Sequence, residues 1–256
     1  MIYHKNIKLW FIVLGVVAIA SVFLVVYFLQ SRSKNKLAGI SETSIDQTEV
    51  FNQSSGSGLS TVKTQEEEVR QLPGSFLLSV PFQSQAPFGD WSQPYQDGCE
   101  EAAIIIVEHY LDSSSLSKDQ MKSEIDDAVA WQMANWGTHA DLDADQTLTL
   151  AQNYFKLSGQ VVRNYQLEDL KKYISSGLPI IAPTAGRQLG NPNFRGAGPE
   201  YHNIVIIGYD DSQGIFITND PGTRNGKSYV YKYQTVLDAI SGPKENMEKA
   251  VVVLEK

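Results

Sequence analysis

The chain contains a single cysteine, Cys99, at a position where a cysteine could act as a nucleophile. It follows a loop rich in turn-forming and aromatic residues and opens an apolar segment, residues 99–111, with helical spacing. The free N–H groups and the positive dipole end of a first helical turn stabilise a thiolate. The nearby acids Asp97, Glu100 and Glu101 oppose this effect, because negative charge raises the pKa of a thiol. Cys99 is therefore a candidate nucleophile that needs a base close by, and the alternative is a small buried apolar residue.

Four histidines are available as that base. His4 precedes an apolar membrane-type segment, and His109 lies on the same predicted helix as Cys99, about 15 Å further along its axis. Neither reaches the thiol. His139 lies in a polar stretch and stays open as a second candidate, or else as a loop or cap residue. His202 stands at the start of the predicted strand 203–209, after a loop rich in glycine and proline, where a base can project into a cleft. We therefore favour His202.

A partner for this histidine follows from the next strand. Residues 203–209 and 215–218 read as two strands joined by a short run of turn formers, which predicts a hairpin. If the turn centres on Asp211, His202 lies opposite Asp220, and opposed side chains have Cβ atoms about 4.5–5.5 Å apart. The spacing predicts that Asp220 orients the imidazole. The alternative is that Asp220 only starts the turn that follows it.

The elements that would position these residues change character along the chain. Asp97 followed by Glu100 has the form of a capping arrangement that starts the first helix at Gly98. Helices come first and strands afterwards, which predicts an α+β domain rather than an alternating α/β fold. The expected helices are 99–111, 118–131, 143–157 and 167–176, and the expected strands are 76–82, 178–184, 203–209, 215–218, 228–233 and 250–254.

Four motifs in this order resemble the bacterial C39-like peptidases, which are papain-like cysteine peptidases related to the double-glycine leader peptidases. They are VPFQSQ at 80–85, DGCEEAA at 97–103, HNIVIIGYD at 202–210 and NDPGT at 219–223. The resemblance spans about residues 75–254. It implies a papain-like α+β fold in which an N-terminal helical part carries the nucleophile and the C-terminal part forms an antiparallel sheet.

The resemblance also assigns roles. It implies that Cys99 is the nucleophile, His202 the base and Asp220 the residue that orients the base. It further implies that the side-chain amide of Gln85 forms an oxyanion hole with the Cys99 backbone N–H, and Gln83, on the same strand face, is the alternative donor. The implied activity is hydrolysis of peptide or isopeptide bonds in a peptide or protein substrate. An inactive papain-like binding module and an acyl transferase that uses the same thioester remain as alternatives.

Five aromatic residues are candidates to line a peptide groove, although packing in the core or at its rim is the simpler interpretation for each of them. They are Trp91, Tyr95, Trp131, Trp136 and Tyr201.

Composition excludes several other classes of protein. The net charge of -8 disfavours binding to nucleic acid, because binding to the phosphate backbone needs an excess of basic residues. One cysteine excludes disulfides within the chain and any multi-cysteine metal site. Asp141, Asp143 and Asp145 mimic the start of a calcium loop, but Gln146 and Gln152 replace the required glycine and glutamate. We interpret that stretch as an acidic, capped helix start and expect no metal or other cofactor.

The N-terminal part predicts attachment to a lipid bilayer. Residues 9–29 carry no charge, and a helix of this length spans the roughly 30 Å hydrocarbon core. We interpret them, after the short flank 1–8, as a single-pass signal anchor; a signal peptide cleaved after an A-x-A site is the alternative. Basic residues flank both ends and leave the orientation open, and we expect the folded domain on the extracytoplasmic side. Residues 30–73, rich in Ser, Gln and Glu, read as a disordered tether to the peptidase domain, 74–256.

Overall fold

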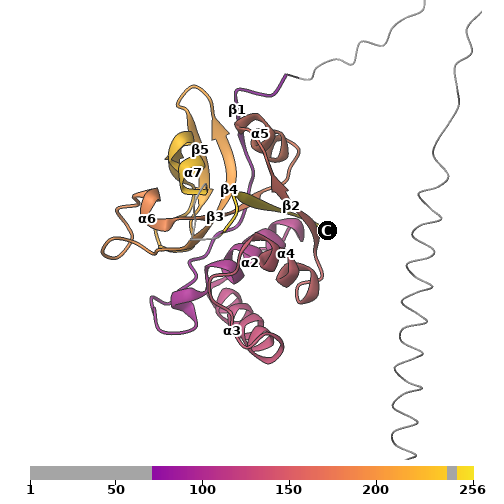
Figure 1. Cartoon of the computed structure of the whole chain (residues 1–256), viewed down its shortest axis with the longest axis vertical. Coiled ribbons are helices and arrows are strands. Elements are labelled where there is room, and N and C mark those ends of the chain that lie inside the picture. Colours follow the sequence, from indigo (N-terminus) through magenta and orange to yellow (C-terminus); the bar gives the residue numbers. More distant parts are fainter. Residues whose placement is uncertain (1–70, 241–246) are drawn as a thin grey trace, which may run out of the picture. The chain divides into compact units, whose positions relative to one another are not determined.

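The structure is a computed structural model that describes residues 71–240 and 247–256 (Figure 1). The predicted N-terminal flank, the predicted membrane helix and nearly all of the predicted tether lie outside the described residues. Across the described ranges, no helix combines the length and the apolar character needed to cross a membrane. The predicted peptidase domain, 74–256, falls within these ranges except for residues 241–246.

An antiparallel sheet forms the centre of the described domain. Its strands in spatial order are β2 (Ser158–Arg163), β7 (Ala250–Glu255), β3 (Ile180–Thr184), β4 (His202–Asp210), β5 (Ile215–Asn219) and β6 (Tyr229–Lys232). The short strand β1 (Ser75–Leu77) pairs with the last residues of β4. Strand β4 therefore contacts three neighbours along its length, which fixes the position of His202 at its start.

The helices lie against this sheet and against one another. They are the 3-10 turn η1 (Tyr95–Asp97), α2 (Cys99–Leu111), α3 (Lys118–Asn135), α4 (Ala144–Asn153), α5 (Leu167–Ser175), α6 (Gly186–Leu189) and α7 (Tyr233–Ile240). Figure 1 shows α2, α3 and α4 gathered together, with α6 and α7 on the far side of β3 and β4 from them. Helix α2 packs on β4, and α4 packs on β2 and β7.

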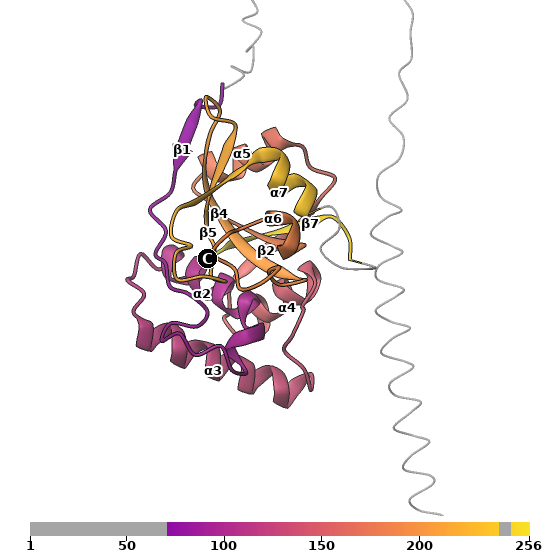
Figure 2. The same ribbon diagram turned by 90° about the vertical axis from the view of Figure 1, so that its left-hand side faces the viewer.

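Helix α2 is the core helix of the domain. Residues 102–107 are all completely buried, and a helix that is apolar on every side is stable only inside a core. Burial of each isoleucine in this stretch contributes about 1.5–3 kcal/mol. Figure 2 shows α2 between β4 and the outer helix α3, in agreement with its contacts to both. The N-terminus of α2, which carries Cys99, is thereby held against the sheet.

The α+β prediction is confirmed, and the helix at 99–111 has the predicted bounds. The helix expected at 118–131 extends to Asn135. Three larger details also differ. The expected strand at 76–82 is paired only at β1, and a proline at position 81 has no N–H to offer a ladder. The helix expected at 143–157 ends at Asn153, and the unpredicted strand β2 follows it. The unpredicted helices α6 and α7 lie in the part that we expected to contain only strands and loops.

The capping prediction for the first helix is wrong. Gly98 is the N-cap of α2, with no capping hydrogen bond from a side chain. Glu100 does not turn back to the helix start, because its carboxylate accepts hydrogen bonds from Leu142 and Cys99 instead. The acidic stretch before α4 does form a capped helix start, as predicted, since Asp143 and Gln146 make a reciprocal capping box.

Candidate active site

Cys99 is the first residue of α2 and points toward the start of β4. Its backbone N–H therefore has no acceptor within the helix. The residue is 5% exposed, so the thiol lies just beneath the surface. Because α2 is a buried core helix, Cys99 is fixed relative to the residues that face it from the sheet.

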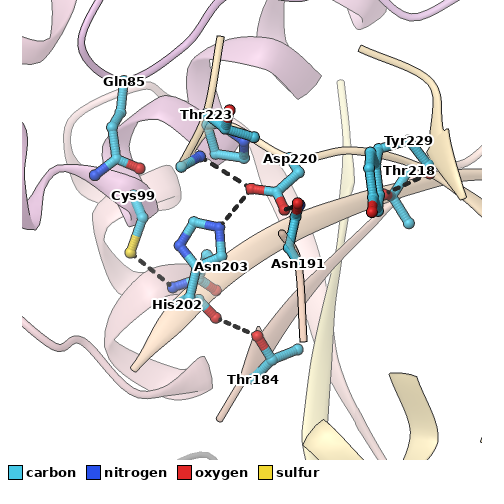
Figure 3. Close-up of polar contacts among 12 residues, drawn as sticks. Gln85, Cys99, Thr184, Asn191, His202, Asn203, Thr218, Asp220, Thr223 and Tyr229 are labelled. Carbon is cyan, nitrogen blue, oxygen red and sulfur yellow. Dashed lines mark hydrogen bonds and ion pairs between the residues drawn. The ribbon is translucent and has the colours of Figure 1, made fainter. Parts of the chain in front are cut away.

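His202 and Asp220 are in direct contact. The imidazole Nε2 lies 2.7 Å from Asp220 Oδ1, and both residues are almost completely buried, at 1% and 0% exposure. A carboxylate only accepts hydrogen bonds, so Nε2 carries the proton and Nδ1 is left as the basic nitrogen. Figure 3 shows the ring between Asp220 and Cys99, with Nε2 toward Asp220 and the second nitrogen on the side of Cys99. This arrangement suits a base that withdraws the proton from the thiol.

The contact does not arise from the register that the sequence predicted. Val205 pairs with Asn219, and Asp210 pairs with Ile215, with a bulge between Ile206 and Gly208. The predicted pairing of positions 202 and 220 is therefore wrong by two residues or more. The contact forms all the same, because the imidazole extends along the sheet to a carboxylate that is diagonal to it.

Asp220 accepts four hydrogen bonds. Besides His202, the backbone N–H of Gly222 donates to Oδ1 at 3.0 Å. The Tyr231 hydroxyl and the Asn191 amide donate to Oδ2 at 2.6 Å and 3.0 Å. Burial alone would raise the pKa of Asp220, but the charge of His202 and these hydrogen bonds outweigh it and hold the pKa below its usual value. Asp220 is therefore an ionised, fixed anchor for the imidazole.

Two residues pack closely against the imidazole ring. The Phe194 ring meets it edge-on, with centroids 5.3 Å apart at 84°. Gly222 also lies against it, since an added Cβ there would stand 2.7 Å from Cε1 and 2.8 Å from Nε2 of His202. The glycine thus allows the backbone to pass directly against the ring, and the orientation of the ring depends on it.

Gly222→Ala tests this packing. The added methyl group would displace the ring from Asp220, and small displacements of reacting groups cost about 100-fold in rate. We expect a loss of peptide hydrolysis of that order, with an unchanged circular dichroism spectrum. Gly74→Ala is the matched control, since a Cβ there meets nothing within 4 Å. Wild-type activity in Gly222→Ala would show that the ring position is not critical.

Gln85 lies beside Cys99 (Figure 3), but its amide group is already engaged. Its Nε2 donates to the carbonyl oxygens of Tyr95 at 2.9 Å and Gln96 at 3.2 Å, which uses both N–H groups. Its Oε1 is buried without a hydrogen-bond partner among the described residues. The alternative, Gln83, donates instead to the Leu116 carbonyl at 3.1 Å. Gln85 can therefore donate to an oxyanion only if one of these two hydrogen bonds breaks. Its role as the oxyanion donor stays a prediction.

The thiol of Cys99 is hydrogen bonded to residues other than His202. It donates to Glu100 Oε2 at 3.0 Å, and the Asn203 amide approaches it at 3.8 Å. Burial raises the pKa of the thiol well above its usual value, the charge and hydrogen bond of Glu100 raise it further, and Asn203 lowers it. The helix N-terminus is expected to stabilise a thiolate, but burial and the neighbouring carboxylate outweigh that effect.

The other described histidines contact acidic residues other than Asp220. His109 contacts Glu124 at 3.1 Å and the Ser115 carbonyl at 2.9 Å, which agrees with its exclusion as a base. His139 Nδ1 lies 3.9 Å from Glu101 Oε1, and burial lowers the pKa of this histidine. Of the two open candidates for the base, the structure brings His202 to the thiol side.

The remaining candidates are the possible metal ligands and the aromatic residues of a possible groove. No group of three or more His, Cys, Asp or Glu side chains within residues 71–240 and 247–256 could hold a metal ion. Trp131 and Trp136 pack edge to face at 5.2 Å, and the Tyr95 hydroxyl donates to Asp126 at 2.7 Å. Trp91 is 39% exposed and remains a candidate for the rim of a groove.

Sequence reasoning missed the residues that support the site. Asn191 and Tyr231 bind Asp220, Gly222 bounds the imidazole, and Asn203 contacts the thiol. Two of them carried a usable signal, because Asn203 directly follows His202 and Gly222 closes the Asp-Pro-Gly turn. Asn191 and Tyr231 come from a loop and a neighbouring strand, where nothing local marks them.

A cysteine at the start of a core helix, facing a histidine–aspartate pair at one end of a sheet, is an arrangement typical of cysteine peptidases. The chain is a member of the Peptidase_C39 like family, whose model matches residues 77–250.

Two solved structures are similar to it, each at 16% identity. One is a C39-like peptidase from Bacillus anthracis, with a TM-score of 0.47, covering 71% of this chain and 98% of its own. The other is xylellain, a cysteine protease from Xylella fastidiosa, with a TM-score of 0.40, covering 73% and 87%. No curated protein matches the chain.

Proposed function

We propose that this chain is a membrane-tethered, papain-like cysteine peptidase that cleaves peptide or isopeptide bonds through Cys99, His202 and Asp220. The observation that carries the proposal is the imidazole held by Asp220 through Nε2, with its basic Nδ1 turned to the side of the only cysteine. In this arrangement a thiol proton can move to Nδ1 and be returned later to a leaving amine.

The mechanism follows from these positions. The thiol proton passes from Sγ to His202 Nδ1, and the thiolate attacks the amide carbon. The tetrahedral oxyanion accepts a hydrogen bond from the Cys99 backbone N–H, and from Gln85 once its amide releases a carbonyl. The C–N bond breaks as the imidazolium gives its proton to the leaving amine, which leaves a thioester on Cys99. Water, activated by the neutral imidazole, then hydrolyses the thioester.

Asp220 supports the charged state of this cycle. Its carboxylate stabilises the imidazolium and fixes the tautomer in which Nδ1 is the base. Tyr231 and Asn191 hold the second carboxylate oxygen and so prevent Asp220 from turning away. No metal or other cofactor enters the proposed reaction.

A second candidate function, a tethered binding module that cleaves nothing, is favoured by one observation. The thiol is buried and donates to Glu100 rather than to His202. An acyl transferase shares the first half-reaction, because an amine can take the thioester in place of water.

A peptide vinyl sulfone tests the proposal, since it alkylates a cysteine that an adjacent base activates. We expect a single adduct on Cys99 of the full-length chain, and its loss in His202→Ala. Failure of the wild-type protein to react with the probe, together with no cleavage of a mixed peptide library, would favour the binding module.

The membrane assignment is part of the proposal and predicts an extraction result. Because residues 9–29 are uncharged and long enough to span a bilayer, the full-length chain should stay in membranes washed with alkaline carbonate. A fragment that begins at Gly74 should be soluble and folded. Recovery of the chain in the soluble fraction without its first 20 residues would support the cleaved signal peptide instead.

A further inference from the structure

A closed ring of hydrogen bonds lies beneath the thiol. Cys99 Sγ donates to Glu100 Oε2 at 3.0 Å, and Glu100 Oε1 accepts from the Leu142 backbone N–H at 2.7 Å. The Tyr201 hydroxyl donates to the Leu142 carbonyl. The Asn203 amide closes the ring by contacting the Tyr201 hydroxyl at 3.0 Å and Cys99 Sγ at 3.8 Å. All five residues are buried, so water does not compete for these contacts.

We propose that Glu100 is a positioning residue that keeps Cys99 as a neutral thiol in the resting site, so that the thiol must leave Glu100 for His202 before it can attack. The proposal rests on the proposed function, because it concerns the nucleophile of that reaction. The step that it controls is a proton transfer in which the Sγ–H bond breaks, an Nδ1–H bond forms on His202, and a thiolate and an imidazolium result.

The position of Glu100 is fixed by the fold rather than by the thiol. Its carboxylate is completely buried and is tied through Oε1 to the backbone just before α4. The second oxygen, Oε2, is thereby placed 3.0 Å from Sγ. A buried carboxylate at this distance opposes a negative charge on sulfur, since little solvent lies between them to screen the repulsion. Burial, and then the charge of Glu101, also raise the pKa of Glu100 well above its usual value, so Glu100 and the thiol resist carrying negative charge at the same time.

The other charged and titratable groups near the thiol come from several elements and from the segments that join them. Glu101 on α2 also raises the pKa of the thiol, but less than Glu100 does, and Asp97 from η1 acts on Glu101 in turn. Burial, and then the charges of Glu100 and Cys99, raise the pKa of Tyr201 well above its usual value, and Asp141, before α4, adds to this. His139 Nδ1 lies 3.9 Å from Glu101 Oε1. A cation that can offset these carboxylates is protonated His202, the first residue of β4, whose partner is Asp220.

The substitution Glu100→Gln should favour the thiolate form of Cys99 over the neutral thiol. The glutamine Oε1 can keep the bond from the Leu142 N–H, which places its NH2 group where Oε2 contacts the thiol. The substitution removes the negative charge and offers a donor to sulfur, and both changes favour the thiolate. The pKa of Cys99 should therefore fall.

The experiment is the rate of alkylation by iodoacetamide across pH 5–10, followed by intact-protein mass on the full-length chain in detergent. The single cysteine makes every adduct attributable to Cys99. We expect Glu100→Gln to react at least about tenfold faster than wild type near neutral pH, which corresponds to a pKa lower by about one unit. Glu101→Gln is the matched control: its carboxylate is equally buried but is bound by Gln132, so its rate should stay within about threefold of wild type.

Equal or slower alkylation of Glu100→Gln, or an equal acceleration in Glu101→Gln, would overturn the inference. The wild-type protein gives a second test that needs no variant: the pKa of Cys99 from its pH profile should exceed that of a cysteine peptide, and a lower value would also overturn it. Failure of the proposed function is distinguishable, because alkylation needs no substrate. If Glu100→Gln accelerates alkylation but the wild-type protein cleaves no peptide, only the proposed peptidase function is rejected. If the protein cleaves peptides through Cys99 but Glu100→Gln does not accelerate alkylation, only the role of Glu100 is rejected.

Discussion

Cys99→Ala is expected to lower the rate of peptide hydrolysis by at least about 10⁴-fold, because the substitution removes the atom that forms the thioester. His202→Ala should cost about as much, since nothing else on the facing sheet is placed to take the thiol proton. The double variant should be no slower than either single one, because residues that act as one unit show strongly non-additive effects. The measurement is the rate on one peptide substrate near neutral pH.

The other histidines provide the controls for this result. His139→Ala and His109→Ala should keep activity close to that of wild type, because their contacts are with Glu101 and Glu124. Circular dichroism of each variant would separate a loss of chemistry from a loss of fold. Loss of activity in His139→Ala with retention in His202→Ala would contradict the assignment of the base.

Substitutions of Asp220 should separate orientation from charge. In Asp220→Asn, the oxygen can remain toward His202 and Gly222, which both donate, and the NH2 group then faces Tyr231 and Asn191. The imidazole stays oriented but loses the charge that stabilises its protonated form. We expect turnover to fall by about 100-fold in Asp220→Asn and by about 10⁴-fold in Asp220→Ala, where nothing holds the ring.

The same substitutions should lower stability, because Asp220 is a completely buried acceptor of four hydrogen bonds. Leaving a buried partner unpaired costs about 3–5 kcal/mol, so Asp220→Ala should melt at a distinctly lower temperature. Asp210→Asn at the other end of β4 is the control, since its carboxylate contacts Ser212 and Gln213 in the hairpin turn. Wild-type turnover in a folded Asp220→Ala protein would remove Asp220 from the mechanism.

The part of the fold that could be predicted is the part set by local pattern. Helix α2 has its predicted bounds, because the continuous apolar run at 102–107 is stable only inside a core and its neighbours keep helical spacing. Strand β2 was missed, because it is an edge strand with polar residues and a glycine, and its pairing with β7 is almost 100 residues distant in the chain. The predicted hairpin register was wrong because the turn is not centred on Asp211: Asp210 pairs with Ile215, which centres the turn between Ser212 and Gln213, and nothing in the run of turn formers marks that centre. The bulge between Ile206 and Gly208 also leaves no mark in the sequence.

In the candidate site, too, some residues could be predicted from the sequence, whereas their tertiary contacts could not. Residue types and their order singled out Cys99, His202 and Asp220, and the resemblance to a family added Gln85. The hydrogen bonds of Gln85 to two carbonyl groups, and of Glu100 to the thiol and to Leu142, depend on how η1 and the start of α4 pack around α2. No local pattern encodes such contacts. The capping role predicted for Glu100 was wrong for this reason, because its carboxylate serves the tertiary structure instead of the helix end.

The most direct test of the central claim is intact-protein mass spectrometry of the full-length chain, quenched in acid during turnover of a peptide. We predict a transient mass increase equal to the acyl part of the substrate, located on Cys99, that disappears as product forms. Glu100→Gln should form this thioester and Cys99→Ala should not. Cleavage of the peptide without any adduct on Cys99, or with an adduct on another residue, would contradict the assignment of Cys99 as the nucleophile.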